Sequence, residues 1–556
     1  MTNRQLKIAL AQLNPTVGDI AGNLAKAREA HAEARVQGAD LIVFSELFIT
    51  GYPPEDLVLK PAFAEASRRA VEDLARDTVG GPGILIGAIW PDANGTETAL
   101  YNSVAMLDQG EITGVRHKVA LPNYSVFDEK RVFDAGPLPG PVNFRGVRIG
   151  VPICEDIWFD EVPECLAESG AEMLLVANGS PYDRDKRETR VNIVVARVTE
   201  TGLPLAYVNQ VGGQDELVFD GGSLVINPGG ALAVQMAGWA ETIQMTTWTE
   251  TDDGWMCEPG PRALIEESDA ADYLACMYGL RDYVSKNGFP GVVLGLSGGI
   301  DSALCAALAV DALGADKDNI IMLPYRYTSA ESVTDARLCA ETLGVRYDTV
   351  PIGGAVDAMG DALAPLFAGL EPGVTEENIQ SRMRGSTLMA VSNKFGGMVV
   401  TTGNKSEMSV GYATLYGDMN GGYNPIKDLY KTEVYRLSAW RNVNRPEGAL
   451  GPSGVVIPEN IITKAPTAEL RENQTDQDSL PEYDVLDDIL KCLVDREMPI
   501  PDIIARGHAP ETVQRIERLL YIAEYKRRQA APGVKISSRN FGRDRRYPIV
   551  NKFREL

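Results

Sequence analysis

The sequence predicts an α/β protein with two domains, a mixed-sheet domain followed by a doubly wound parallel-sheet domain. Three observations lead to this prediction. The 556 residues exceed what one compact domain usually holds. Short apolar runs alternate with amphipathic stretches on both sides of a polar segment between residues 242 and 267. Hairpin turn signals mark the first half, whereas the second half alternates regularly between strand and helix patterns.

In the first half, short apolar runs predict strands at 7–11, 40–44, 83–89, 102–107, 147–153, 172–177, 205–208 and 223–226. Amphipathic stretches predict helices at 23–37 and 62–77. Asp108-Gln109-Gly110 and Asn227-Pro228-Gly229-Gly230 are hairpin signals. The first domain is therefore expected to be a mixed sheet unit with several antiparallel pairs.

Thr, Glu, Asp, Gly and Pro dominate the polar segment, so we predict domains at 1–245 and 268–556 with a linker at 246–267. The second domain has predicted strands at 291–296, 319–323, 346–350 and 398–401. Predicted helices lie at 302–313, 331–343 and 377–393. Such βα alternation predicts a parallel, doubly wound, Rossmann-like sheet.

Composition and charge exclude several classes of protein. Hydrophobic residues make up 44% and charged residues 23%, which excludes a disordered or fibrous chain. The formal net charge of −24 disfavours general nucleic-acid binding, although a local basic pocket for a small phosphorylated substrate stays open. Seven cysteines without a CxxC pair argue against a disulfide framework and a structural zinc site. With no signal-peptide core and no predicted membrane span, a cytoplasmic location is expected.

A glycine-rich string follows the predicted strand 291–296 and opens the next helix. It reads Gly295, Leu296, Ser297, Gly298, Gly299, Ile300, Asp301 and Ser302. Glycines let the backbone approach an anion, and a helix N-terminus directs N–H groups at it. Asp301 suits a Mg²⁺ ion that bridges phosphates. The chain has no Gly-Lys dipeptide, so this is not a Walker A loop. The alternative is a glycine-rich turn without a ligand.

Three reactive side chains in the first half follow predicted strands. They are Glu46, Lys118 and Cys154, and open α/β sheets place their sites at such strand ends. Cys154 could attack an amide carbon as a thiolate, Lys118 could lower the thiol pKa and stabilise an oxyanion, and Glu46 could carry the proton. Taken singly, each has a structural alternative, because a lone cysteine is more often buried packing and a lone charged residue is usually surface.

The second half resembles the N-type ATP pyrophosphatases in its SGGIDS loop, and NAD⁺ synthetases in the strings 377–385, 401–407, 416–418, 428–432 and 465–470. The resemblance implies that the loop, Thr402, Lys431 and Thr467 bind ATP and that Asp301 and Glu407 bind Mg²⁺. It also implies that Asn378, Arg382, Glu407 and Lys526 face deamido-NAD⁺. The alternative for Arg382 and Lys526 is a solvated helix face. The resemblance departs at the tail, where Tyr525 precedes Lys526.

Residues 6–236 resemble the carbon–nitrogen hydrolase (nitrilase) superfamily, whose triad is Glu-Lys-Cys. This implies an α-β-β-α sandwich, a catalytic triad of Glu46, Lys118 and Cys154, and a further acid at Glu129. It also implies glutamine contacts from Tyr124, Ser180 and Lys186. The other six cysteines have no such sequence context and are interpreted as structural.

Together the halves resemble the glutamine-dependent NAD⁺ synthetases. The resemblance implies a homo-oligomeric ligase for the last step of NAD⁺ biosynthesis, with glutamine, ATP and deamido-NAD⁺ as substrates, Mg²⁺ as cofactor and an adenylated intermediate. Two competitors stay open: a simple amidase or nitrilase with a degenerate nucleotide domain, and a non-catalytic nucleotide-binding regulator. The intact loop disfavours the first, and the retained nucleophile disfavours the second.

Overall fold

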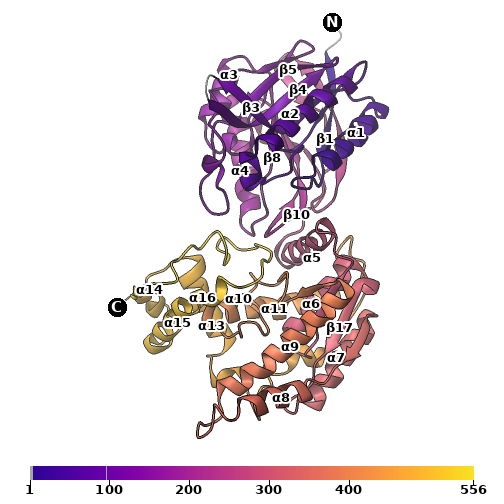
Figure 1. Cartoon of the computed structure of the whole chain (residues 1–556). Coiled ribbons are helices and arrows are strands. Elements are labelled where there is room, and N and C mark those ends of the chain that lie inside the picture. The colour runs from indigo at the N-terminus through magenta and orange to yellow at the C-terminus, as the bar shows by residue number, and fades with distance from the viewer. Residues whose placement is uncertain (1–3, 95–96, 556) are drawn as a thin grey trace. The chain divides into compact units, whose positions relative to one another are not determined.

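The structure is a computed structural model that describes residues 4–94 and 97–555 (Figure 1). It divides between Glu266 and Glu267 into two compact units. Each unit has its own sheets and its own apolar core.

The first unit contains a seven-stranded sheet, ordered β15-β14-β1-β2-β3-β4-β5, and a six-stranded sheet, ordered β13-β12-β9-β8-β7-β6. The strands of the first sheet are β1 (Gln5–Gln12), β2 (Leu41–Val43), β3 (Gly83–Asn94), β4 (Glu97–Asp108), β5 (Glu111–His117), β14 (Thr242–Thr251) and β15 (Gly254–Cys257). Those of the second are β6 (Val142–Phe144), β7 (Val147–Gly150), β8 (Met173–Asn178), β9 (Leu205–Asn209), β12 (Leu224–Asn227) and β13 (Ala231–Gln235). A separate ribbon pairs β10 (Val211–Gln214) with β11 (Leu217–Asp220).

The two sheets pack face to face, and Ile8 of β1 and Phe144 of β6 are buried in the shared core. Helices α1 (Ile20–Val36) and α2 (Pro61–Ala75) cover the outer face of the first sheet, and α3 (Glu161–Glu168) and α4 (Lys186–Thr201) cover that of the second. On α1, the small buried residues Ala27, Ala30 and Ala34 form one stripe that faces the sheet. The predicted α-β-β-α sandwich is confirmed.

The polar segment after residue 242 differs from the prediction. Residues 246–257, predicted as the start of a linker, lie in β14 and β15, and β14 pairs antiparallel with β1 along its length. Thr246 and Trp248 alternate inward and are buried, while their neighbours are partly exposed. A threonine-rich edge region of a sheet therefore has a linker-like composition, because only every second residue faces the core.

The second unit is built on a parallel sheet ordered β18-β17-β16-β19. Its strands are β16 (Val292–Gly295), β17 (Asp318–Met322), β18 (Arg346–Thr349) and β19 (Met398–Val400), and its helices include α5 (Ser268–Lys286), α6 (Ile300–Leu313), α7 (Ala330–Leu343), α8 (Gly353–Leu363), α9 (Val374–Phe395) and α11 (Lys431–Val443). Helices α8 and α9 pack on one face of the sheet. Helix α6 is buried along nearly all its length and contacts α5 and α11. The predicted doubly wound parallel sheet is confirmed.

The remaining helices, α10 (Lys405–Val410), α12 (Glu459–Thr463), α13 (Tyr483–Leu490), α14 (Ile500–Ala505), α15 (Pro510–Ile522) and α16 (Glu524–Arg527), follow β19. Residues 525–546 are rich in lysine and arginine, and three of these cations, Arg527, Lys535 and Arg545, are buried. Arg527 and Arg545 both pair with buried Glu524, and Lys535 pairs with buried Asp544. These cations therefore hold the C-terminal segment in place instead of forming an exposed patch.

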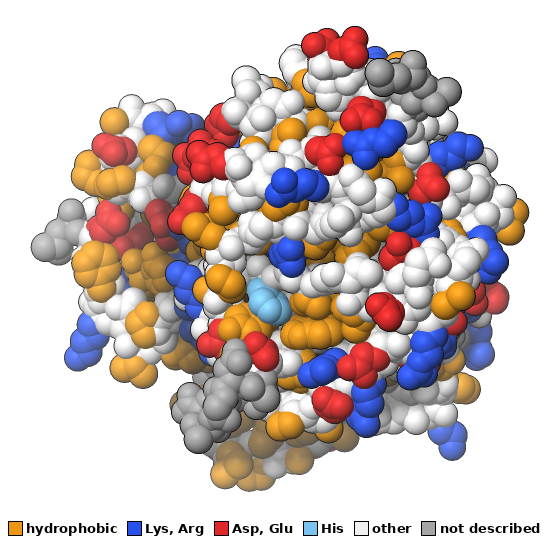
Figure 2. All heavy atoms as spheres, turned by 90° about the horizontal axis from the view of Figure 1, so that it is seen from above, with side chains coloured by type: hydrophobic (Ala, Val, Ile, Leu, Met, Phe, Trp, Pro, Cys, Tyr) orange, Lys and Arg blue, Asp and Glu red, His pale blue; other side chains and the backbone are white. Residues whose placement is uncertain are grey.

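On the face drawn in Figure 2, acidic and basic side chains are interspersed. Within residues 4–94 and 97–555, no helix combines the length and the apolar character that crossing a bilayer requires.

Candidate active sites

Cys154 lies just beyond the carboxyl end of β7 and begins a 3₁₀ helix that ends at Trp158. Its backbone φ is 44°, in the left-handed region that residues with a Cβ rarely adopt. Its side chain is only slightly exposed. A strained turn at a strand end directs a side chain out of the sheet, and such strain gathers at reactive residues. The local backbone therefore suits a nucleophile.

Glu46 and Lys118 form a fully buried ion pair, although they follow different strands, β2 and β5. Lys118 Nζ lies 2.7 Å from Glu46 Oε1 and 2.8 Å from Glu129 Oε1. Asn102 Nδ2 donates to Glu46 Oε1 at 2.7 Å, and the Gly179 N–H donates to Glu46 Oε2 at 2.9 Å. The structure thus joins three of the predicted residues, Glu46, Lys118 and Glu129, in one network.

Burial controls the protonation of this network. It raises the pKa of the Cys154 thiol well above its ordinary value, and Glu46 adds to this more than Lys118 opposes it. Burial also acts against the charge of Lys118, but Glu129 and Glu46 outweigh it and raise the Lys118 pKa. Burial raises the pKa of Glu129 to about 7. Lys118 does lower the pKa of the thiol, as the sequence predicts, but burial and Glu46 outweigh it, so the net direction favours a protonated thiol before attack.

Two predicted glutamine contacts, Tyr124 and Lys186, are close enough to Cys154 for a thiolate there to influence their protonation. Tyr124 Oη donates to Glu155 Oε1 at 2.8 Å, and both residues line one cavity. Burial lowers the pKa of Lys186 to about 8, and the positive charge of Arg190 adds to this. Glu155 and Lys186 thus bring one carboxyl group and one ammonium group to the region of Cys154, which suits the amino and carboxylate groups of an amino acid.

Ser180, the third predicted glutamine contact, lies two residues after β8 and is buried. Its Oγ accepts a hydrogen bond from Arg190 Nε at 3.1 Å, and its N–H donates to Asn209 Oδ1 at 3.0 Å. Arg190 is itself held by both carboxylate oxygens of Asp220, at 2.7 and 2.9 Å. The position of Ser180 is therefore set by an ion pair that the sequence did not reveal.

Asp156 links the backbone next to Lys118 to the backbone next to Cys154 through hydrogen bonds. Its Oδ1 accepts from the N–H groups of Val119 and Ala120 at 3.0 and 2.8 Å, and its Oδ2 accepts from the Ile153 N–H at 2.9 Å. These donors immediately follow Lys118 and precede Cys154. Asp156 is thus a positioning residue that sets the spacing of the two.

We expect Asp156→Asn to slow amide hydrolysis at Cys154 about ten- to hundredfold, because an amide nitrogen would face a backbone N–H. The loss should appear in kcat for release of the acid product, with little change in KM. Asp160→Asn, an exposed position nearby, is the control. An unchanged kcat in Asp156→Asn would contradict the positioning role.

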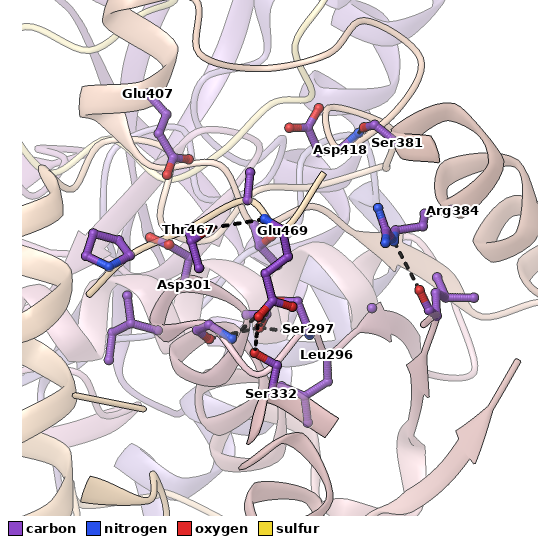
Figure 3. A pocket seen from close by; sticks show the side chains of 18 of the residues that line it. Leu296, Ser297, Asp301, Ser332, Ser381, Arg384, Glu407, Asp418, Thr467 and Glu469 are labelled. Atoms are coloured by element: carbon purple, nitrogen blue, oxygen red, sulfur yellow. Dashed lines mark hydrogen bonds between the residues drawn. The ribbon is translucent and has the colours of Figure 1, made fainter. Parts of the chain in front are cut away.

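The glycine-rich string connects β16 to α6 and lines a cavity of about 280 Å³ (Figure 3). Every residue of the predicted loop except Gly298 lines it, as do Thr402, Glu407, Lys431 and Thr467. Gly298 has φ 84°, and a Cβ there would lie 2.3 Å from the Ser332 carbonyl oxygen. Glycine is therefore required where the loop passes the first turn of α7.

Asp301 and Glu407 come together around one ammonium group. Lys431 Nζ contacts Asp301 Oδ2 and lies 3.3 Å from Glu407 Oε1. Asn404 Nδ2 donates to Asp301 Oδ1 at 2.8 Å. Burial raises the pKa of Glu407 to about 8, with Lys431 opposing the rise. Two converging carboxyl groups beside a phosphate loop are a donor set that fits Mg²⁺.

The described residues that line this cavity do not include Asn378, Arg382 or Lys526. All three instead contact one loop, residues 411–415. Thr414 Oγ1 donates to Asn378 Oδ1 at 2.9 Å, Arg382 Nε donates to the Leu415 carbonyl at 3.2 Å, and Lys526 Nζ donates to the Gly411 and Ala413 carbonyls at 2.8 and 2.7 Å. The loop leads to Asp418, which does line the cavity.

Residues 7–251 match the family model for carbon-nitrogen hydrolases, and residues 273–530 match that for NAD synthases. A glutamine-dependent NAD(+) synthetase of Rhodobacter capsulatus is 51% identical over 555 residues, with 100% of each chain covered. The chain belongs to the glutamine-dependent NAD⁺ synthetase family. A Xanthomonas campestris relative of the same name is 47% identical and covers 100% of this chain and 99% of its own. The solved glutamine-dependent NAD⁺ synthetase of Acinetobacter baumannii, in complex with ADP, is 41% identical, with 100% of each chain covered and a TM-score of 0.78.

Sequence reasoning missed several residues at the two sites of this glutamine-dependent NAD⁺ synthetase family member. Figure 3 shows Ser381, Arg384, Asp418 and Glu469 around the cavity that the glycine-rich string lines. All four fall inside the strings that carry the family resemblance, so closer attention to those strings could have found them. Asn102, which holds Glu46, carries no local sequence signal, because only the pairing of distant strands brings it there.

Proposed function

We propose that this chain makes NAD⁺ from deamido-NAD⁺, ATP and glutamine, and releases AMP, pyrophosphate and glutamate. The observation that carries the proposal is the joint presence of two equipped sites in one chain. A buried Glu46–Lys118 pair accompanies Cys154, and a phosphate loop lines a nucleotide-sized cavity with two carboxyl groups. An amidase acting alone would not need the second site, and a nucleotide-binding regulator would not need the first.

In the first unit, the Cys154 thiol gives its proton to Glu46 as the sulfur attacks the side-chain amide carbon of glutamine. Lys118 stabilises the negative charge that develops on the amide oxygen. Glu46 then protonates the leaving nitrogen, and the C–N bond breaks to give ammonia and a thioester. Water, deprotonated by Glu46, hydrolyses the thioester to glutamate and restores the thiol.

In the second unit, a carboxylate oxygen of deamido-NAD⁺ attacks the α-phosphorus of ATP, and the bond to the β-phosphate breaks. The N–H groups at the start of α6 and the ammonium of Lys431 hold the departing pyrophosphate. Mg²⁺, held by Asp301 and Glu407, would neutralise charge on the phosphates. Thr402 would offer a hydroxyl to ATP, and Thr467 would do so on releasing the Gln474 carbonyl, to which its hydroxyl donates at 2.6 Å. Ammonia then attacks the adenylated carboxyl carbon, and AMP leaves.

The deamido-NAD⁺ contacts are the finer part of the proposal. Glu407 lines the cavity directly. Asn378, Arg382 and Lys526 support loop 411–415 and would act through it, by placing Asp418 at the substrate. One polar atom of each side chain hydrogen-bonds to this loop, which supports a positioning role.

The proposed function also implies a role for each unit, a homo-oligomeric assembly and a cytoplasmic location. The unit ending at Glu266 would be the glutaminase and the unit beginning at Glu267 the synthetase. Leu366, Leu370 and Val374, in the α8–α9 connection and at the start of α9, are 76%, 70% and 68% exposed, which supports a homo-oligomer. The seven free cysteines support a reducing compartment such as the cytoplasm.

An isotope experiment tests the reaction. With glutamine labelled in its amide nitrogen, the label is expected in the amide of NAD⁺, with one AMP and one pyrophosphate per NAD⁺. Labelled pyrophosphate should exchange into ATP only when deamido-NAD⁺ is present. Formation of ADP in place of AMP, or exchange that needs no deamido-NAD⁺, would contradict the adenylation step.

The KM for glutamine should rise as pH increases through about 8, because burial lowers the pKa of Lys186 to about 8. Below that pH the side chain is charged and attracts the glutamine carboxylate; above it the attraction is lost. Glutamate release measured from about pH 7 to about pH 9 checks this. Lys186→Arg, whose guanidinium stays charged, should give a KM that does not change over this range. The same rise in both proteins would exclude Lys186 as its cause.

A further inference from the structure

Lys431 lies between the two carboxyl groups that are assigned to the metal. The proposed function takes these two groups, those of Asp301 and Glu407, as the magnesium ligands, and the role inferred for Lys431 rests on it. We propose that Lys431 is a stand-in cation: in the nucleotide-free protein its ammonium group holds the two carboxyl groups together and keeps out a free divalent cation. The metal then enters only with ATP, whose phosphates draw the ammonium away.

The contacts of Lys431 support this role. Its side chain is 3% exposed, whereas those of Asp301 and Glu407 are 16% and 18% exposed. The ammonium contacts Asp301 Oδ2 and Glu407 Oε1, and it lies 5.3 Å from the centroid of the Tyr483 ring. Asn404 occupies the other oxygen of Asp301. Both carboxyl oxygens of Asp301 and one of Glu407 are thus already engaged.

Charge explains why the exchange should need a nucleotide. Two carboxyl groups this close together require a cation, and in a partly buried site an ammonium ion and a dication would repel one another strongly. Free Mg²⁺ must therefore remove Lys431, which would lose its partners. ATP changes this, because in the proposed function its phosphates would bind at the Ser297–Ser302 loop, which lines the same cavity, and would offer the ammonium new partners.

By linkage, ATP must then raise the affinity for the metal, and the metal must raise the affinity for ATP by the same factor. The lysine would serve two functions: in the empty site it compensates the carboxyl groups, and in the loaded site it binds phosphate. Lys431 would therefore act before catalysis, by controlling when the metal binds, in addition to contacting ATP.

Binding of Mn²⁺, followed by the electron paramagnetic resonance signal of the free ion, tests the proposal on the full-length protein at one fixed pH. The unaltered protein should bind Mn²⁺ weakly alone and tightly with a non-hydrolysable ATP analogue. Lys431→Met should bind Mn²⁺ alone at least about tenfold more tightly. Lys431→Arg, which keeps the charge, should stay weak, and the double variant Lys431→Met with Asp301→Asn should lose the gain.

Lys464→Met is the matched control, because Lys464 lines the same cavity but pairs with Asp335; Mn²⁺ binding without nucleotide should not change in this variant. If Lys431→Met does not fold, Lys431→Gln replaces it. Equal Mn²⁺ affinity in the unaltered protein and the folded Lys431 variant would overturn the proposal, as would tight Mn²⁺ binding without nucleotide in the unaltered protein. If Asp301→Asn leaves Mn²⁺ binding with nucleotide intact, the metal assignment within the proposed function is what fails, and the stand-in role falls with it.

Discussion

Cys154→Ala is expected to abolish NAD⁺ synthesis from glutamine and to leave synthesis from ammonium salts intact at alkaline pH. Without the sulfur no thioester can form, so the glutamine-dependent rate should fall at least about a thousandfold. The loss of one buried sulfur should cost about 1–2 kcal/mol of stability, too little to unfold the unit. NAD⁺ formation with each nitrogen donor in turn, alongside a melting curve, measures the outcome.

The chain offers a matched control for this experiment. Cys257 is a second free cysteine in the same core cluster, and Cys257→Ala should keep both activities. Lys118→Ala and Glu46→Ala should show the same separation as Cys154→Ala. Continued use of glutamine by Cys154→Ala would mean that the nucleophile lies elsewhere. Loss of both donors in a folded variant would mean that the two sites cannot be separated.

Asp301→Asn is expected to abolish NAD⁺ synthesis from glutamine and from ammonia alike. The change removes the carboxylate proposed to hold Mg²⁺ at the first turn of α6 but leaves the backbone of the glycine-rich loop able to form. A loss of about a hundredfold or more is expected, because charge stabilisation at transferring phosphates is among the largest catalytic effects. ATP–pyrophosphate exchange, measured with deamido-NAD⁺, checks the loss at the adenylation step.

Glutamate release by Asp301→Asn should persist, because the first unit shares none of these residues. Asp316→Asn, at an exposed position shortly after α6, is the control and should behave as the unaltered protein does. Near-normal synthesis from ammonia by Asp301→Asn would show that the loop has been assigned the wrong role.

The local pattern of apolar and polar residues was enough to predict most of the fold. The regular βα alternation after residue 290 predicts a parallel sheet because strand and helix periods are read over a few residues each. It failed at β14, where Thr246 and Trp248 face the core but their polar neighbours resemble a linker. Whether such a strand is in a sheet depends on β1, its partner from the other end of the unit, and no local window contains that information.

For the two sites, the sequence by itself determined which chemical groups are present: a cysteine with an acid and a lysine, and an anion loop with two carboxylates. Only the tertiary structure decided how they are charged and joined. Glu46 and Lys118 are 72 positions apart and Asp301 and Lys431 are 130 apart, yet each pair is in contact. Burial then raises the thiol pKa of Cys154 where a neighbouring lysine suggested the opposite. The physical reason is that desolvation depends on everything packed around a group, which chain neighbours do not reveal.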